Sequence, residues 1–274
     1  MSEMFGFDVF SPKEIAARVE AVGLAKARLP FLAMLMLGIL AGAFIGLGAL
    51  YFVLVKSDPA LGFATGQVLG GVVFSLGLIL VVVAGAELFT GNNLLAMAWA
   101  DGKISTRELL RNWTIVCVGN FIGAAGLALL VFLSHHPEMN NGAVGQQYLK
   151  IAQAKVAIPF WTAFFKGVLC NILVCMAVWM AFAGRSVIDK AVAIVFPISA
   201  FVAAGFEHSV ANMYFIPLAM LLETFGTTGP NAHAITWFGF FSNLVPVILG
   251  NILGGSVLVG LVYYVIYRRA LSEN

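Results

Sequence analysis

The chain has 274 residues, of which 61% are hydrophobic and only 10% are charged. Soluble domains carry about 25% charged residues, so too few charges are available here to cover a water-facing surface. This composition excludes a soluble enzyme, a disordered chain and a nucleic-acid-binding protein with a basic face. A spanning helix needs ~20 mostly apolar residues, so the length allows about six spans rather than twelve.

Residues 1–28 contain the signals of an amphipathic helix on the cytoplasmic side. Ser11 and Glu14 fit a capping box, and Pro12 suits the first helical position. Apolar residues then recur on one stripe, with charged residues off it. We expect this helix to lie at the membrane face or against the bundle.

Six apolar segments follow within residues 29–267, and a short cytoplasmic tail is predicted at 268–274. Polar stretches interrupt the second and the fifth segment, which predicts two broken helices. We therefore predict an all-α integral membrane protein with six transmembrane helices. The segments cover 29–55, 66–99, 113–133, 159–183, 191–222 and 240–267, with interruptions at 87–93 and 207–212.

Basic residues set the expected orientation, because cytoplasmic loops carry an excess of lysine and arginine. With six spans and an inner N-terminus, the outer side holds only Lys56, Lys150 and Lys155. Lys166 lies within the fourth segment, and every other lysine and arginine falls on the inner side. Both termini are therefore predicted to be cytoplasmic.

An internal repeat relates the two halves. Residues 85–92 and 205–212 both read Gly-x-Glu-x-x-x-x-Asn, and residues 119–123 and 250–254 both read Gly-Asn-x-(Ile/Leu)-Gly. Each half has three spans, so the second half enters the membrane in the opposite sense. This arrangement predicts a 3+3 inverted repeat whose paired interruptions mark the transport path.

The interruptions expose backbone groups that hydrocarbon cannot solvate, so polar side chains are expected to satisfy them. Glu87 and Glu207 occupy equivalent positions, and we interpret both as structural acceptors of the freed backbone N–H groups. A role as charged ligands in a cation pathway is the alternative. Asn92 and Asn212 are interpreted as structural residues that tie the backbone ends together.

His208 is the one histidine within an interruption. Ionisable residues inside spans are rare and usually functional, so we place His208 on the transport path. Thr90 supplies a hydroxyl in the other interruption, and a hydrogen bond between the two residues is expected.

Two lysines have open interpretations. Lys155 is either an interfacial lysine or the source of a positive field that draws anions into an outer vestibule. Lys166 either pairs with a glutamate or reaches a subunit interface. The sequence does not decide between these interpretations.

Two motifs in a fixed order make the chain recognisable. Residues 86–91 read Ala-Glu-Leu-Phe-Thr-Gly, and residues 205–213 read Gly-Phe-Glu-His-Ser-Val-Ala-Asn-Met. These stretches resemble the formate/nitrite transporter family of bacterial anion channels. The resemblance covers nearly the whole chain, with further matching stretches at 74–78, 111–113, 169–171 and 173–180.

The resemblance implies an aquaporin-like fold in a homopentamer of the bacterial inner membrane, with one pore per protomer. It implies small anions of weak acids as substrates: formate, nitrite, hydrosulfide, acetate and lactate, with residues 184–190 favouring formate. It also implies that residues 88–93 form a mobile loop that can gate the pore. The implied polar pathway residues are Thr90, Lys155, Asn171 and His208, and the implied constriction residues are Phe74, Leu78, Phe89, Val174 and Phe201.

Physical chemistry favours weak acids for such a pore. A small anion in a low-dielectric pore faces a desolvation penalty of order 20 kcal/mol before relaxation. Protonation removes this penalty, and a histidine is the side chain best suited to exchange the proton near neutral pH. We therefore expect electrically silent, pH-dependent passage in which His208 takes part.

Other classes fit less well. A neutral-solute channel of aquaporin type would carry paired Asn-Pro-Ala boxes, whereas Met213 and Tyr214 follow Asn212. Metalloprotease and nucleophile-elbow motifs are absent from the sequence, so no enzymatic activity is expected. The cysteines lie inside apolar runs without metal-site spacing, so no metal or cofactor is expected.

Overall fold

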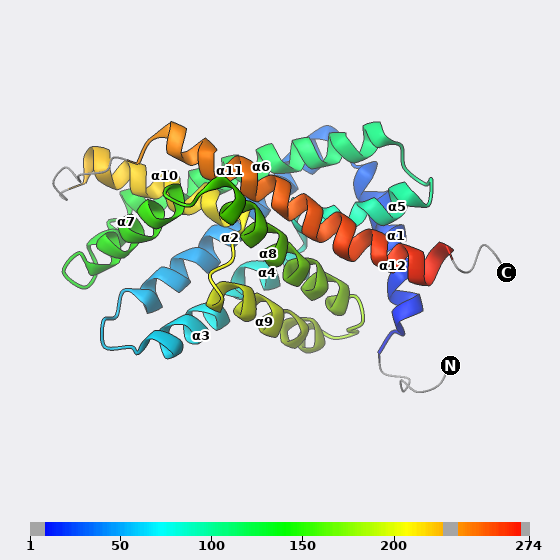
Figure 1. The fold of residues 1–274 in the computed structure, drawn as a ribbon, viewed down its shortest axis with the longest axis horizontal. Helices are drawn as coiled ribbons and strands as arrows, with labels where there is room; N and C mark the ends of the chain where they lie inside the picture. Colours follow the sequence, from blue (N-terminus) through cyan, green and yellow to red (C-terminus); the bar gives the residue numbers. More distant parts are fainter. Residues whose placement is uncertain (1–8, 227–234, 270–274) are drawn as a thin grey trace.

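The computed structural model describes residues 9–226 and 235–269, and this part of the chain is helical with short connections (Figure 1). The α-helices are α1 (Pro12–Ala27), α2 (Phe31–Lys56), α3 (Phe63–Phe74), α4 (Leu76–Leu80), α5 (Ala96–Ala100), α6 (Thr106–Leu133), α7 (Ala143–Val156), α8 (Phe160–Ala181), α9 (Val187–Ala203), α10 (Ser209–Phe225), α11 (Trp237–Ile252) and α12 (Val262–Tyr264). Shorter turns of π-helix are η1 (Val81–Gly85), η4 (Leu253–Leu261) and η5 (Val265–Arg269), and 3-10 turns are η2 (Gly91–Leu95) and η3 (His136–Glu138). Residues 270–274 of the predicted tail lie outside the described residues.

Five helical stretches in the described part are long and apolar enough to cross a membrane. They cover Phe31–Lys56, Phe63–Gly85, Thr106–Leu133, Phe160–Ala181 and Trp237–Arg269. The shorter helices α9 and α10 follow one another, separated by residues 204–208. The chain is therefore a bundle of apolar helices with many large hydrophobic side chains on its outer surface.

Helix α6 extends beyond the apolar pattern, because a polar capping signal sets its start, and helix α7 lies between the predicted segments. The third predicted segment began at 113, whereas α6 starts at Thr106, after a capping box of Ser105 and Glu108. The Ser105 side chain accepts from the Glu108 N–H, and the Glu108 carboxylate accepts from Ser105 N. The amphipathic helix α7 was not predicted, because it lies in a stretch of modest polarity between two apolar segments.

The two halves use the same close helix contacts. Helix α2 packs along α6, and α8 packs along α11 and η4. A Cβ atom at Gly123 would collide with the carbonyl oxygen of Ile39, and one at Gly254 would collide with that of Val168. Small residues at these crossings let the backbones approach, as is usual in membrane bundles.

Helix α1 has the predicted capping box and is fastened to the bundle through a buried carboxylate. Glu20 is 1% exposed and forms ion pairs with Lys103, before α6, and with Arg268 in η5. Desolvation and the nearby Arg268 charge lower the pKa of Lys103 from its ordinary value. Glu20 therefore joins α1 to both the α5–α6 connection and the C-terminal helical turns (Figure 1).

Replacing Glu20 with glutamine is expected to loosen α1 from the bundle, because Arg268 loses its counter-charge in a desolvated contact and Lys103 keeps only Asp101. Limited trypsin digestion of the detergent-solubilised protein should cleave at Arg18 roughly tenfold faster than in the wild type. Glu138→Gln, an exposed carboxylate elsewhere, is the matched control. Equal cleavage rates in Glu20→Gln and wild type would contradict this role.

Candidate functional site

Two short extended stretches interrupt the helices at corresponding places. The first helical stretch stops at Gly85, and helical backbone resumes at Gly91. The second stops before Gly205 and resumes at Ser209. Gly85 and Gly205 have φ of +85° and +70°, a region that glycine enters without strain. Each glycine thus turns the chain out of its helix just ahead of a glutamate.

Glu87 lies in a polar cluster at the first interruption. Its carboxylate pairs with the Lys26 ammonium of α1 at 3.0 Å and accepts from Asn92 Nδ2 at 2.7 Å. The Asn92 amide also donates to Asn112 Oδ1 at 3.0 Å, and Asn112 donates to the Lys26 carbonyl at 3.2 Å. Side chains from α1, η2 and α6 therefore enclose one carboxylate.

Glu207 lies in a second cluster with the same composition. Its carboxylate pairs with Lys155 of α7 at 2.9 Å and accepts from Asn212 Nδ2 at 2.7 Å. Asn212 donates to Asn243 Oδ1 at 2.6 Å, and Asn243 donates to the Lys155 carbonyl at 2.9 Å. These four contacts of the first cluster each have a counterpart here.

The groups that donate to the two carboxylates are not the ones expected from the sequence. Backbone N–H groups were expected to donate to them, but the hydrogen bonds of Glu87 and Glu207 come from lysine and asparagine side chains. A charged donor neutralises a carboxylate in this apolar setting more fully than a neutral amide does. Lys155 is therefore part of an ion pair and is not a free interfacial lysine.

Three cluster residues were missed as members of the repeat: Lys26, Asn112 and Asn243. Spacing would have found them, since Lys26 precedes Gly38 by the same interval by which Lys155 precedes Gly167. The pairs Asn112/Asn120 and Asn243/Asn251 are also equally spaced. The repeat therefore extends to the amphipathic helices α1 and α7, each of which precedes its half.

A second pair of asparagines supports the extended stretches. Asn120 Nδ2 donates to the carbonyls of Gly38 and Glu87, and its Oδ1 accepts from Phe89 N. Asn251 donates to the carbonyls of Gly167 and Glu207, and its Oδ1 accepts from Ser209 N. These amides satisfy the backbone groups that the interruptions release.

The predicted hydrogen bond between Thr90 and His208 is present. Thr90 Oγ1 lies 2.9 Å from His208 Nε2, and both residues are buried. The N–H of Ala211 donates to His208 Nδ1 at 3.1 Å, so His208 also caps helix α10. An Nδ1 that accepts leaves the proton of a neutral ring on Nε2, which then donates to Thr90. The Thr90 hydroxyl hydrogen is left free to donate to another acceptor.

Asn171 on α8 fixes the backbone beside Thr90. Its Nδ2 donates to the carbonyl of Thr90 at 3.2 Å, to Asn93 Oδ1 at 2.7 Å and to the carbonyl of Asn251 at 2.7 Å. Two amide hydrogens are shared among three acceptors, so the donor capacity of Asn171 is used within the protein.

The segment that follows the first interruption is held from several sides. Besides its contacts with Glu87 and Asn112, Asn92 accepts from Lys26 Nζ through its side chain and from Trp113 Nε1 through its carbonyl. The Asn93 carbonyl accepts from the hydroxyl of Ser256. Helices α1, α6 and α8 and turn η4 thus all contact the stretch that was expected to be a mobile loop.

The five residues predicted to form constrictions are buried together in one apolar cluster: Phe74, Leu78, Phe89, Val174 and Phe201. The rings of Phe74 and Phe201 meet edge to face at a centroid distance of 5.8 Å. Phe201 in turn stacks on the His208 ring, also at 5.8 Å. The Thr90–His208 pair therefore lies directly beside this apolar cluster.

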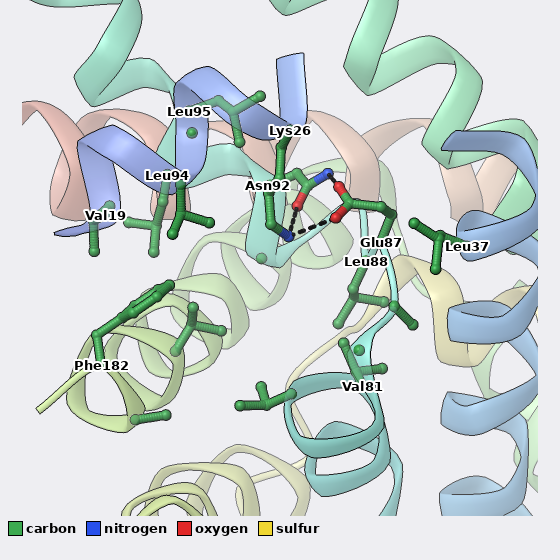
Figure 2. Close-up of a pocket in the computed structure, with 18 of the residues that line it drawn as sticks. Val19, Lys26, Leu37, Val81, Glu87, Leu88, Asn92, Leu94, Leu95 and Phe182 are labelled. Atoms are coloured by element: carbon green, nitrogen blue, oxygen red, sulfur yellow. Dashed lines mark hydrogen bonds and ion pairs between the residues drawn. The ribbon is translucent and has the colours of Figure 1, made fainter. Parts of the chain in front are cut away.

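A cavity of about 480 Å³ lies between α1 and the first interruption. Figure 2 shows Lys26, Glu87 and Asn92 joined at its wall, with Leu37, Val81 and Leu88 around them. Val178 and Phe182 of the α8 end and Lys190 of α9 complete it. The cavity is mostly apolar, and its polar side chains are those of Lys26, Glu87 and Asn92 and that of Lys190.

Comparison with known proteins identifies the family to which the chain is similar. A family model described as formate/nitrite transporter matches residues 13–265. The chain is 40% identical to the formate channel FocA of Escherichia coli, with 96% of each chain covered.

Solved structures agree with this placement. A solved structure described as a pentameric formate channel with formate bound is similar with a TM-score of 0.82 and 40% identity, covering 86% of this chain and 97% of that one. The aquaglyceroporin of Plasmodium falciparum, at 15% identity and a TM-score of 0.50, shares the fold alone. The matched region includes both interruptions, both Lys–Glu–Asn–Asn clusters and the Thr90–His208 pair. The chain therefore belongs to the formate/nitrite transporter family.

Proposed function

We propose that this protein is a membrane channel for small monovalent anions of weak acids, with formate as the preferred substrate and a pore through each protomer. The observation that carries the proposal is the Thr90–His208 hydrogen bond at 2.9 Å, buried beside the Phe74–Phe201 contact. It offers a hydroxyl donor to a small anion where the path is otherwise apolar. The relatives are formate channels, which supports formate over nitrite or hydrosulfide.

The proposed membrane topology has six spans in a 3+3 inverted repeat. The first half contains α2, the interrupted unit α3–α5 and α6, and the second contains α8, the interrupted unit α9–α10 and α11 with η4. The matched clusters on Glu87 and Glu207 support this symmetry. Helices α1 and α7 lie at opposite ends of the bundle, as an inverted repeat requires (Figure 1).

The proposed division of the chain follows the same symmetry. Residues 1–28 form a cytoplasmic amphipathic helix, residues 29–267 form the channel, and residues 268–274 form a cytoplasmic tail. The α1 end gathers Lys26, Lys103 and Arg268, which favours a cytoplasmic position for that end. We place the protein in the bacterial inner membrane as a homopentamer, by analogy with the pentameric relative.

In the proposed passage the anion crosses the apolar barrier as the protonated acid. Thr90 donates its free hydroxyl hydrogen to a carboxylate oxygen, while His208 Nε2 orients that hydroxyl. His208 takes up a proton at Nδ1 only when the Ala211 N–H bond opens. The Nε2 proton then passes through the Thr90 hydroxyl to the carboxylate oxygen, which leaves the ring neutral and the anion as the acid. Proton exchange by His208 is therefore coupled to the cap of α10. Asn171 keeps the Thr90 peptide in place.

A flux panel on purified protein in liposomes tests the proposed function. Formate, nitrite, hydrosulfide and chloride are compared at two pH values, with glycerol and water as neutral solutes. Formate is expected to pass fastest, with faster uptake on the acidic side of neutral, because protonation removes the charge of a weak acid. Chloride passage equal to that of formate, or glycerol swelling without formate flux, would overturn the proposal.

A further inference from the structure

Each lysine that faces a helix interruption is neutralised by its own glutamate. Lys155 contacts both carboxylate oxygens of Glu207, at 2.9 and 3.0 Å, and only 14% of its side chain is exposed. Lys26 pairs with Glu87 at 3.0 Å. An ion pair acts as a dipole, whose field falls off faster with distance than that of a single charge. These two lysines therefore attract a distant anion only weakly.

The cavity beside the first interruption is lined by another lysine, whose ammonium is not paired with a carboxylate of any described residue. Lys190 of α9 lines this cavity together with Lys26. Within residues 9–226 and 235–269, its ammonium makes neither a hydrogen bond nor an ion pair. Lys190 therefore contributes a whole positive charge to the entrance at this end.

The repeat identifies a counterpart at the other end. Glu87 N donates to the carbonyl of Leu37 at 3.2 Å, and Glu207 N donates to that of Lys166 at 3.3 Å. Leu37 and Lys166 are therefore equivalent positions. The Leu37 side chain lines the first cavity beside Glu87 (Figure 2). By the same geometry, we expect the Lys166 side chain to lie beside Glu207 at the other end of the bundle.

Two further observations support this placement of Lys166. It is half-buried within an apolar helix, and in the described part of the chain its ammonium has no hydrogen-bond or ion-pair partner. Ionisable side chains inside spans face the bundle interior or a water-filled cavity rather than lipid. A water-filled entrance beside Glu207 would satisfy this requirement for Lys166, whereas the apolar side chain of the equivalent Leu37 has no such requirement.

We propose that the unpaired lysines Lys190 and Lys166, one at each end of the bundle, are the charges that concentrate anions at the two ends of the pore. Lys26 and Lys155 then serve to hold the interruptions in shape. A vestibule of one sign with apolar walls focuses its field and raises the local concentration of a counter-ion. This inference rests on the proposed function.

Initial rates of formate uptake by proteoliposomes test the inference. Lys166→Gln and Lys190→Gln are each expected to lower the rate roughly three- to tenfold at an ionic strength of about 0.01 M, and the difference should disappear near 1 M. Lys150→Gln on α7 and Lys13→Gln on α1 remove exposed charges from the same ends and serve as matched controls with small effects.

Charge rescue separates an electrostatic role from a structural one. Lys166→Cys, in a background with Cys117→Ser, is treated with cationic and anionic methanethiosulfonates, since Cys170 and Cys175 are buried. The cationic adduct should restore uptake, and the anionic adduct should reduce it further. Equal effects of the two adducts, or wild-type uptake by Lys166→Gln at low salt, would overturn the inference. Absence of formate uptake by the wild type would instead overturn the proposed function.

Discussion

Replacing His208 with asparagine is expected to remove the contribution of the histidine to the pH dependence of formate flux between about pH 5 and 8. Asparagine is a strong N-cap residue, so its side-chain oxygen can still accept from Ala211 N and the start of α10 is preserved. The substitution removes the titratable ring that contacts the Thr90 hydroxyl. Flux then reports only the protonation of formate itself.

The measurement is initial uptake of labelled formate by proteoliposomes over that pH range, with the anion gradient held constant. His136→Asn is the matched control, because His136 lies in the η3 turn, where burial lowers its pKa, and far from Thr90 in the chain. Its pH profile should match that of the wild type. A wild-type pH profile in His208→Asn would reject the role of this residue in proton exchange.

Replacing Lys155 with methionine is expected to cause the largest loss of stability of any single change at the site. The substitution leaves the Glu207 carboxylate, 5% exposed, without its counter-charge. Breaking a buried ion pair by removing one partner costs about 3–5 kcal/mol, because the remaining charge is uncompensated. Asn212 and Asn243 would remain as neutral partners.

Thermal unfolding of the detergent-solubilised protein, followed by size-exclusion chromatography, measures this loss. Adding Glu207→Gln to Lys155→Met should recover much of the lost thermal stability, because the uncompensated charge disappears. The same cycle at Lys26 and Glu87 should give a smaller coupling, since Lys26 is more exposed than Lys155. Strictly additive losses at Lys155 and Glu207 would show that the pair is not coupled.

Sequence patterns predicted the features that depend on local chemistry. Apolar length gave the main helices, capping chemistry gave the start of α1, and the Gly-x-Glu motif gave both interruptions to within a few residues. The Thr90–His208 contact was also predictable, because the repeat places both interruptions at the centre of the bundle.

The partners of the glutamates were less predictable. Lys26 and Lys155 lie on amphipathic helices outside the apolar segments, and the identity of their carboxylate partners depends on how those helices fold back against the bundle. Asn171 was implied as a pathway residue by the family resemblance, but its donors are directed to Thr90, Asn93 and Asn251. Such contacts join residues that are distant in the sequence, and no local pattern encodes them.

The neutral pairs have a consequence for how the protein responds to membrane voltage. A single charge that moves across the membrane potential contributes about 2.3 kcal/mol per 100 mV, whereas a lysine and a glutamate that move together contribute nothing. Lys26–Glu87 and Lys155–Glu207 each move as a unit if an interruption shifts. Any rearrangement of the two interruptions should therefore carry little gating charge, and pore opening should not follow the membrane potential.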